Sequence, residues 1–66
     1  MALTVEDKNN LQNTYSGLVI YEVGQTWKGQ DVISGTVIVT YNNNSNALAD
    51  NFSDIDTWCQ WVDNNS

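Results

Sequence analysis

Two stretches of the chain carry oxygen-bearing side chains at alternate positions, an arrangement that could hold calcium. Asparagines alternate through 42–46, and Asp54 and Asp56 follow later. A calcium loop of the EF-hand type needs early carboxylates, glycine at its sixth position and glutamate at its twelfth. The first stretch offers amides in place of carboxylates, and Cys59 takes the glycine position in the second. The aspartates are typical of a helix N-terminus, so we predict no metal and no cofactor.

Cys59 is the only cysteine, and the chain has no histidine. A nucleophilic thiolate needs a base or positively charged surroundings, whereas the nearest charges here belong to aspartates. One cysteine without histidine also excludes an intrachain disulfide and argues against a structural zinc site. We therefore expect Cys59 to pack in the core.

Glu22 is the carboxylate that could act as a general acid. It shares one face of a predicted strand with Leu18 and Ile20, and a covered face would raise its pKa. The alternative places Glu22 at the rim, where solvent reaches it. A domain of 66 residues has little depth in which to bury a substrate, so we predict that the protein is not an enzyme.

The tryptophans suggest a contact surface, because exposed tryptophan is strongly enriched at the energetic centres of interfaces. Trp58 lies at the border of a predicted helical seam, and Trp61 lies outside it. For Trp61 the alternative is a frayed last turn that folds over the sheet edge. Trp27 either lines the surface or caps the core from a turn. The predicted surface comprises Trp61, Trp58, Trp27, Asp54, Asp56 and Asp63.

The charge balance limits the partners. Eight acids oppose two lysines, with no arginine, for a net charge of −6. Nucleic acids and anionic lipids are bound mainly through lysine and arginine, so we predict no nucleic-acid and no membrane partner. An acidic protein is attracted to basic surfaces, and the expected partner is another protein with such a surface.

A short helix is predicted over about 4–15. Thr4 can cap it, Glu6 and Asp7 suit its first turn, and Gly17 can end it.

The strands are predicted within 18–41, where β-branched and aromatic residues alternate between glycines. Either 28–31 turns one long hairpin, or two turns create a three-stranded meander with a central strand near 26–33. We favour the meander because three strands are more stable than an isolated hairpin.

An Asn-rich loop is predicted over 42–46, since asparagine tolerates turn conformations, and a second helix over about 46–63. The helix is supported by an apolar seam with helical spacing. Ser53 with Asp56 could instead form a capping box that starts a shorter helix and leaves 46–52 as a turn. The seam residues are Leu48, Phe52, Ile55, Cys59 and Val62.

These elements predict a single α+β domain over 1–66, in which an antiparallel meander of two to three strands packs against the C-terminal helix, beside a short N-terminal helix. The expected function is a small acidic non-enzymatic protein-interaction or regulatory module, which could form a homodimer through its exposed tryptophan surface. The alternative is an inhibitor that mimics nucleic-acid phosphates and occludes a basic groove. The residues 1–8 lack the features of a signal peptide, and a lone cysteine suits a reducing cytoplasm.

Overall fold

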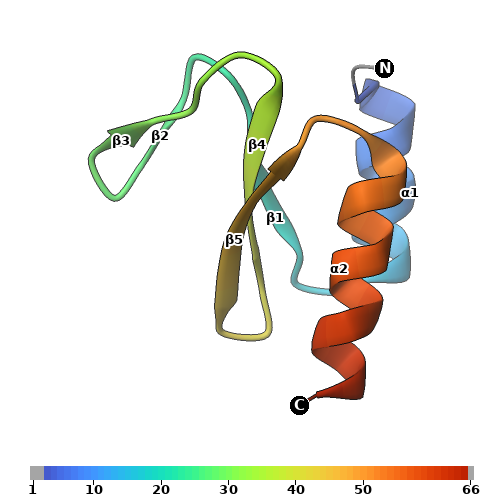
Figure 1. The fold of residues 1–66 in the computed structure, drawn as a ribbon. Helices are drawn as coiled ribbons and strands as arrows, with labels where there is room; N and C mark the ends of the chain where they lie inside the picture. The colour runs from blue at the N-terminus through green and yellow to red at the C-terminus, as the bar shows by residue number, and fades with distance from the viewer. Residues whose placement is uncertain (1–2, 66) are drawn as a thin grey trace.

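The computed structural model describes residues 3–65 and has the predicted α+β architecture, with two helices on one side of a small antiparallel sheet (Figure 1). The fold class is therefore confirmed. The elements in chain order are α1 (Val5–Thr14), β1 (Val19–Tyr21), β2 (Thr26–Trp27), β3 (Gln30–Asp31), β4 (Thr36–Tyr41), β5 (Asn44–Ala49) and α2 (Phe52–Asn64).

The main sheet has the strand order β1-β4-β5, and all its pairs are antiparallel. Segment 26–33 does not form the central strand of the favoured meander, because β1 pairs directly with β4. Strands β2 and β3 instead form a separate small hairpin between them. Its turn residues, Lys28 and Gly29, have φ of 50° and 81°. Such consecutive left-handed residues are typical of two-residue hairpin turns, so the long-hairpin alternative described this segment better.

The third strand of the sheet comes from the segment predicted as an Asn-rich loop. Only Asn42 and Asn43 form the turn, with φ of 49° and 66°, and β5 begins immediately afterwards at Asn44. The prediction of a loop over 42–46 was therefore wrong in its extent. Asparagine tolerates the left-handed conformation, so two residues suffice to reverse the chain and pair Tyr41 with Asn44.

Helix α2 begins at Phe52, so the predicted start near 46 was also wrong. Its N-cap is Asn51, whose side-chain oxygen accepts the Asp54 backbone N–H at 2.9 Å. The Ser53 alternative was right that the helix is shorter, although it placed the cap two residues late. Leu48 belongs to β5, yet it packs against the same core, because strand alternation also turns it toward the helices.

Helix α1 begins as predicted at a Thr4 cap. The Thr4 hydroxyl accepts the Asp7 backbone N–H at 3.0 Å, and the Asp7 carboxylate accepts the Thr4 N–H in return. Leu11 is the buried residue of this helix. The helix thus contributes one side of its last turns to the core and leaves the rest in solvent.

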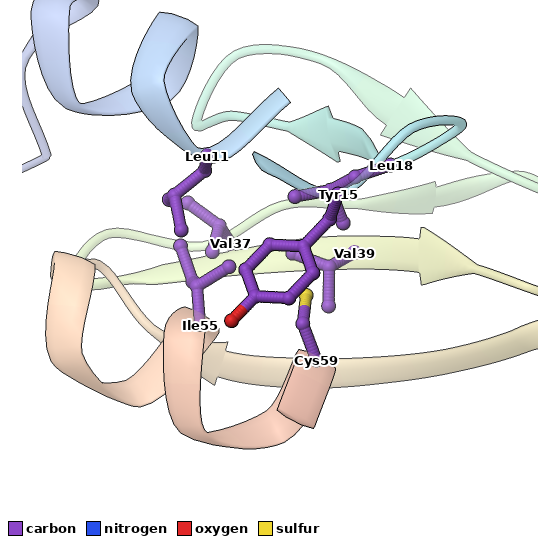
Figure 2. Packing of buried hydrophobic residues seen from close by; sticks show 7 residues of the cluster. All are labelled: Leu11, Tyr15, Leu18, Val37, Val39, Ile55 and Cys59. Carbon is purple, nitrogen blue, oxygen red and sulfur yellow. The ribbon is translucent and has the colours of Figure 1, made fainter. Parts of the chain in front are cut away.

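The core lies between the two helices and one face of the sheet (Figure 2). Val37 and Val39 point from β4 toward the helices, and Ile55 and Cys59 meet them from α2. Ile38 points to the opposite face, because side chains alternate along a strand. Within residues 3–65, no helix covers that opposite face (Figure 1). The buried residues of this core cluster are Leu11, Tyr15, Leu18, Val37, Val39, Ile55 and Cys59.

Candidate contact surface

Trp61 lies on the outer side of α2 with 56% of its surface exposed. The helix continues past it to Asn64. The Asn65 backbone N–H and side-chain amide both donate to the Trp61 carbonyl oxygen, at 3.1 Å and 2.7 Å. The last turn is therefore hydrogen-bonded, and the alternative in which Trp61 leaves a frayed turn to cover the sheet edge was wrong.

Trp58 precedes Trp61 by three residues on the same helix and is partly buried against the core cluster. Side chains three residues apart are neighbours on a helix surface. The two side chains thus form a continuous aromatic surface on α2. Trp58 packs against the edge of the core, and Trp61 extends into solvent.

Asp54 lies in the exposed first turn of α2. Its backbone N–H donates to Asn51, and its carboxylate accepts the Asn51 side-chain amide at 3.2 Å. A carboxylate in this place is stabilised by the partial positive charge of the helix N-terminus. Asp54 therefore has a local role in starting the helix and still presents its charge to solvent.

Asp56 and Asp63 connect α2 to two tyrosines. The Tyr15 hydroxyl donates to the Asp56 carboxylate, which also accepts the Gln60 amide at 3.1 Å. The Tyr41 hydroxyl donates to the Asp63 carboxylate at 2.7 Å. Burial, together with the hydrogen bond to Asp56, raises the pKa of Tyr15 to about 12. The hydrogen bond to Asp63, and then burial, raises the pKa of Tyr41.

The third tryptophan, Trp27, lies elsewhere. It is half-buried in β2, and the Lys28 ammonium nitrogen lies 4.9 Å from the centre of its ring. It lines a hollow of about 200 Å³ that includes Ile38 and Ala47, residues of the sheet face opposite the helices. Strand β2 and helix α2 lie on different sides of the main sheet (Figure 1), so the structure does not bring Trp27 together with Trp58 and Trp61.

The apolar face of the main sheet that borders the Trp27 hollow was not predicted from the sequence. Ile38 retains only 9% exposure there, and Val32 is also buried, although no helix covers them within residues 3–65. A second hollow of about 400 Å³ adjoins them and is lined in part by Ile33. The signal that could have found this face lies in segment 36–41, where Val37 and Val39 on one face alternate with Ile38 on the other. That face carries one isoleucine between two threonines, so the sequence indicates an apolar patch at its centre only.

The groups considered for chemistry have environments that do not activate them. Cys59 is fully buried and free, and burial, with Asp63 and Asp56 nearby, raises its pKa to about 11. Glu22 forms an ion pair with Lys8 and retains 44% of its side-chain exposure, as expected for the rim. In the described part of the chain, no three potential ligands gather to hold a metal. Neither of its helices has the length and apolarity that crossing a membrane requires.

Comparison of the chain with protein-family models, with curated proteins and with solved structures returns no match.

Proposed function

We propose that the chain is a non-enzymatic protein-binding module and that Trp61 anchors its contact surface on α2. The observation that carries the proposal is the 56% exposure of Trp61 on a hydrogen-bonded helical turn. Exposed apolar area of this size is unfavourable in water and favourable at an interface. Trp58 extends the surface toward the core, so the anchor is held on a rigid element.

The acidic residues of α2 indicate the charge of the partner surface. Helix α2 contributes Asp54, Asp56 and Asp63 and has no basic residue. The two lysines act elsewhere, Lys8 with Glu22 and Lys28 over Trp27. A partner with an apolar pocket and a basic rim complements such a surface. A second copy is the other candidate, because burial of two tryptophan surfaces would support a small domain.

Phosphate mimicry has less support as a function. A mimic needs carboxylates that are free to face basic side chains in place of phosphates. The carboxylate of Asp56 accepts the Tyr15 hydroxyl, and that of Asp63 accepts the Tyr41 hydroxyl. Glu22 is neutralised by Lys8. The tyrosine hydroxyls leave Asp56 and Asp63 charged but occupy acceptor positions on them. These aspartates can therefore still attract a basic rim, while fewer acceptor positions remain for the direct contacts that a mimic of phosphates must make.

The proposed compartment is the reducing cytoplasm. Its support is Cys59, which is buried and free and has a raised pKa. A thiol of that kind is protected from oxidation, and an unpaired cysteine is common in reducing compartments.

Affinity capture from a lysate, at low and high salt, tests the proposal with Trp61→Ala and Val5→Ala as a matched pair. Both substitutions remove an exposed apolar side chain from a helix, so they should preserve the fold. We expect Trp61→Ala to lose capture at both salt concentrations and Val5→Ala to retain it. Capture of nucleic-acid-binding proteins that is independent of Trp61 and disappears at high salt would instead support phosphate mimicry. Capture that survives both changes would contradict the Trp61 anchor.

Sedimentation of the wild type and of Trp61→Ala addresses self-association separately. A dimer that dissociates in Trp61→Ala would identify the second copy as a partner. A wild type that remains monomeric at high concentration would remove the homodimer from the proposal.

A further inference from the structure

Strand β5 is an edge of the main sheet, since it pairs with β4 on one side and with no other strand in the described part of the chain. In a two-residue hairpin the residues that flank the turn exchange backbone hydrogen bonds, and the bonding direction then alternates along the strand. Tyr41 and Asn44 flank the turn. The backbone groups of Ser45, Ala47 and Ala49 therefore point outward, away from β4.

Two hydrogen bonds agree with this direction. The Ala47 backbone N–H donates to the side chain of Asn46 at 2.9 Å, and the Ala49 carbonyl accepts the Asn51 N–H at 2.8 Å. Neither partner belongs to β4. The neighbouring Asn46 amide thus occupies the Ala47 donor with a bond that an incoming strand can replace.

The β5 edge lacks the usual protection against added strands. Natural edges are guarded by charged residues, proline or a bulge, or are kept very short. Strand β5 has six residues, Asn44–Ala49, with no charge and no proline, and its pairing with β4 runs without interruption. The opposite edge, β1, has three residues and is followed by the Glu22–Lys8 ion pair.

An apolar groove runs beside the β5 edge on the face that lacks a helix. Its two hollows, of about 200 and 400 Å³, share Gln30, Ile38 and Ala47. Trp27 stands in the first hollow, and Ile33, which is 67% exposed, stands in the second. Side chains that project from an added strand toward this face would find apolar surface there.

We propose that β5 accepts an extended segment of a basic partner protein as a fourth strand of the main sheet. Strand addition obtains affinity from backbone pairing and specificity from alternate side chains. Apolar residues of the segment would lie against Ile38 and Ala47. The residues that line the two hollows include Asp31 and no base. Lys28 lies over the Trp27 ring beside the first hollow, but the chain as a whole has a net charge of −6. Lysine or arginine in the segment therefore fits the groove, whereas a second acidic copy does not.

Amide NMR of the full chain tests this proposal with a capped peptide of alternating valine and threonine with lysines at both ends. We expect saturable shifts at Ser45, Ala47 and Ala49. A peptide with glutamate in place of lysine should bind about tenfold more weakly at low salt. A lysine peptide methylated on alternate backbone nitrogens should lose binding, because it cannot pair with the edge. Absence of shifts with the first peptide, or equal binding by all three, would overturn the proposal.

Two variants locate the site and separate it from the Trp61 surface. Ala47→Lys places a charged side chain in both hollows and should abolish the shifts while the spectrum stays dispersed. Trp61→Ala should leave peptide binding unchanged, so loss of one surface does not imply loss of the other. Should Ala47→Lys bind the peptide as the wild type does, the groove is not the site. A wild-type dimer that Ala47→Lys dissociates would make a second copy the occupant and refute the basic segment.

Discussion

The two faces of the main sheet are built from the same strands and are covered very differently. On the helix face, Val39 has no exposed surface, because α1 and α2 both pack over it. On the other face, Ile38 keeps 9% exposure beneath the small β2–β3 hairpin and borders two hollows. The helix face therefore holds the continuous core. The other face borders two open hollows, so we expect it to contribute less to stability.

The largest effect expected from this comparison is that of Ile55→Ala. Ile55 is fully buried on the helix face, and truncation of such a residue costs about 2–5 kcal/mol. A domain of this size rarely has more than about 5 kcal/mol of stability from its core. We expect the variant to be largely unfolded, as measured by circular dichroism and urea titration.

Ile38→Ala is the matched substitution on the other face. The same atoms are removed, yet the site already borders hollows, so less packing is lost. We expect a decrease of about 1–2 kcal/mol with the fold retained. Equal losses of stability for the two variants would contradict the expectation that the helix face contributes more to stability than the other face.

The part of the core that α2 supplies could be predicted from the sequence, because its residues follow helical spacing alone. Ile55, Cys59 and Val62 follow helical spacing, and all three are buried. Leu48 fits both helix and strand patterns, since it lies four residues before Phe52 and also alternates along β5. Because of this ambiguity, and because the asparagine turn has only two residues, the predicted helix began within the segment that forms β5. Local periodicity could not show whether Leu48 lies in a helix or a strand, because the strand forms only through its pairing with β4.

The next effect concerns pH and is confined to the helix face. The pKa of Cys59 is raised from 9.0 to about 11, and that of Tyr15 from 10.0 to about 12. The folded state therefore retains these protons more strongly than the unfolded state does. Stability is fully present below about pH 9 and decreases as the pH rises toward about 12. Thermal unfolding across this range should show a falling midpoint.

Cys59→Ala serves as the control for that decline. It removes one of the three groups whose pKa is raised, the others being Tyr15 and Tyr41, so its midpoint, relative to its own value at pH 7, should fall less between about pH 9 and 11. An identical alkaline decline in the variant and the wild type would exclude Cys59 as a cause.

A smaller effect is expected at the boundary between β5 and α2, which sets how much of β5 remains an edge strand. Asn51→Ala removes the N-cap acceptor of the Asp54 N–H and should cost about 0.5–2 kcal/mol. Ser53→Ala, at the cap position that the sequence alternative suggested, should change stability by less than about 0.5 kcal/mol. Urea titrations of the two variants measure the two changes in the free energy of unfolding. A larger loss for Ser53→Ala would place the helix start later than Phe52.

The candidate site was less predictable than the core. The exposure of Trp61 follows from its angular position on α2, which sequence periodicity already gave. The position of Trp27 depends on how the separate β2–β3 hairpin folds between β1 and β4, which brings Trp27 to a hollow that Ile38 also lines. Tertiary pairing also determines the contacts of Asp56 and Asp63, because the tyrosines that they meet come from distant segments.

The smallest effect is expected in the turn that joins β4 to β5 and thereby supports both faces. Asn43 has φ of 66°, a conformation that glycine adopts without strain. Asn43→Gly relieves strain but loosens the unfolded chain, so the net gain should be a few tenths of a kcal/mol. Asn43→Ala, which keeps the strain and loses the tolerance of asparagine, should cost about 1 kcal/mol. Urea titration of both variants provides the measurement. Because the turn fixes the β5 register, Asn43→Gly should leave the peptide-induced shifts at Ala47 unchanged, and their loss would mean that the edge depends on a turn geometry other than the one described.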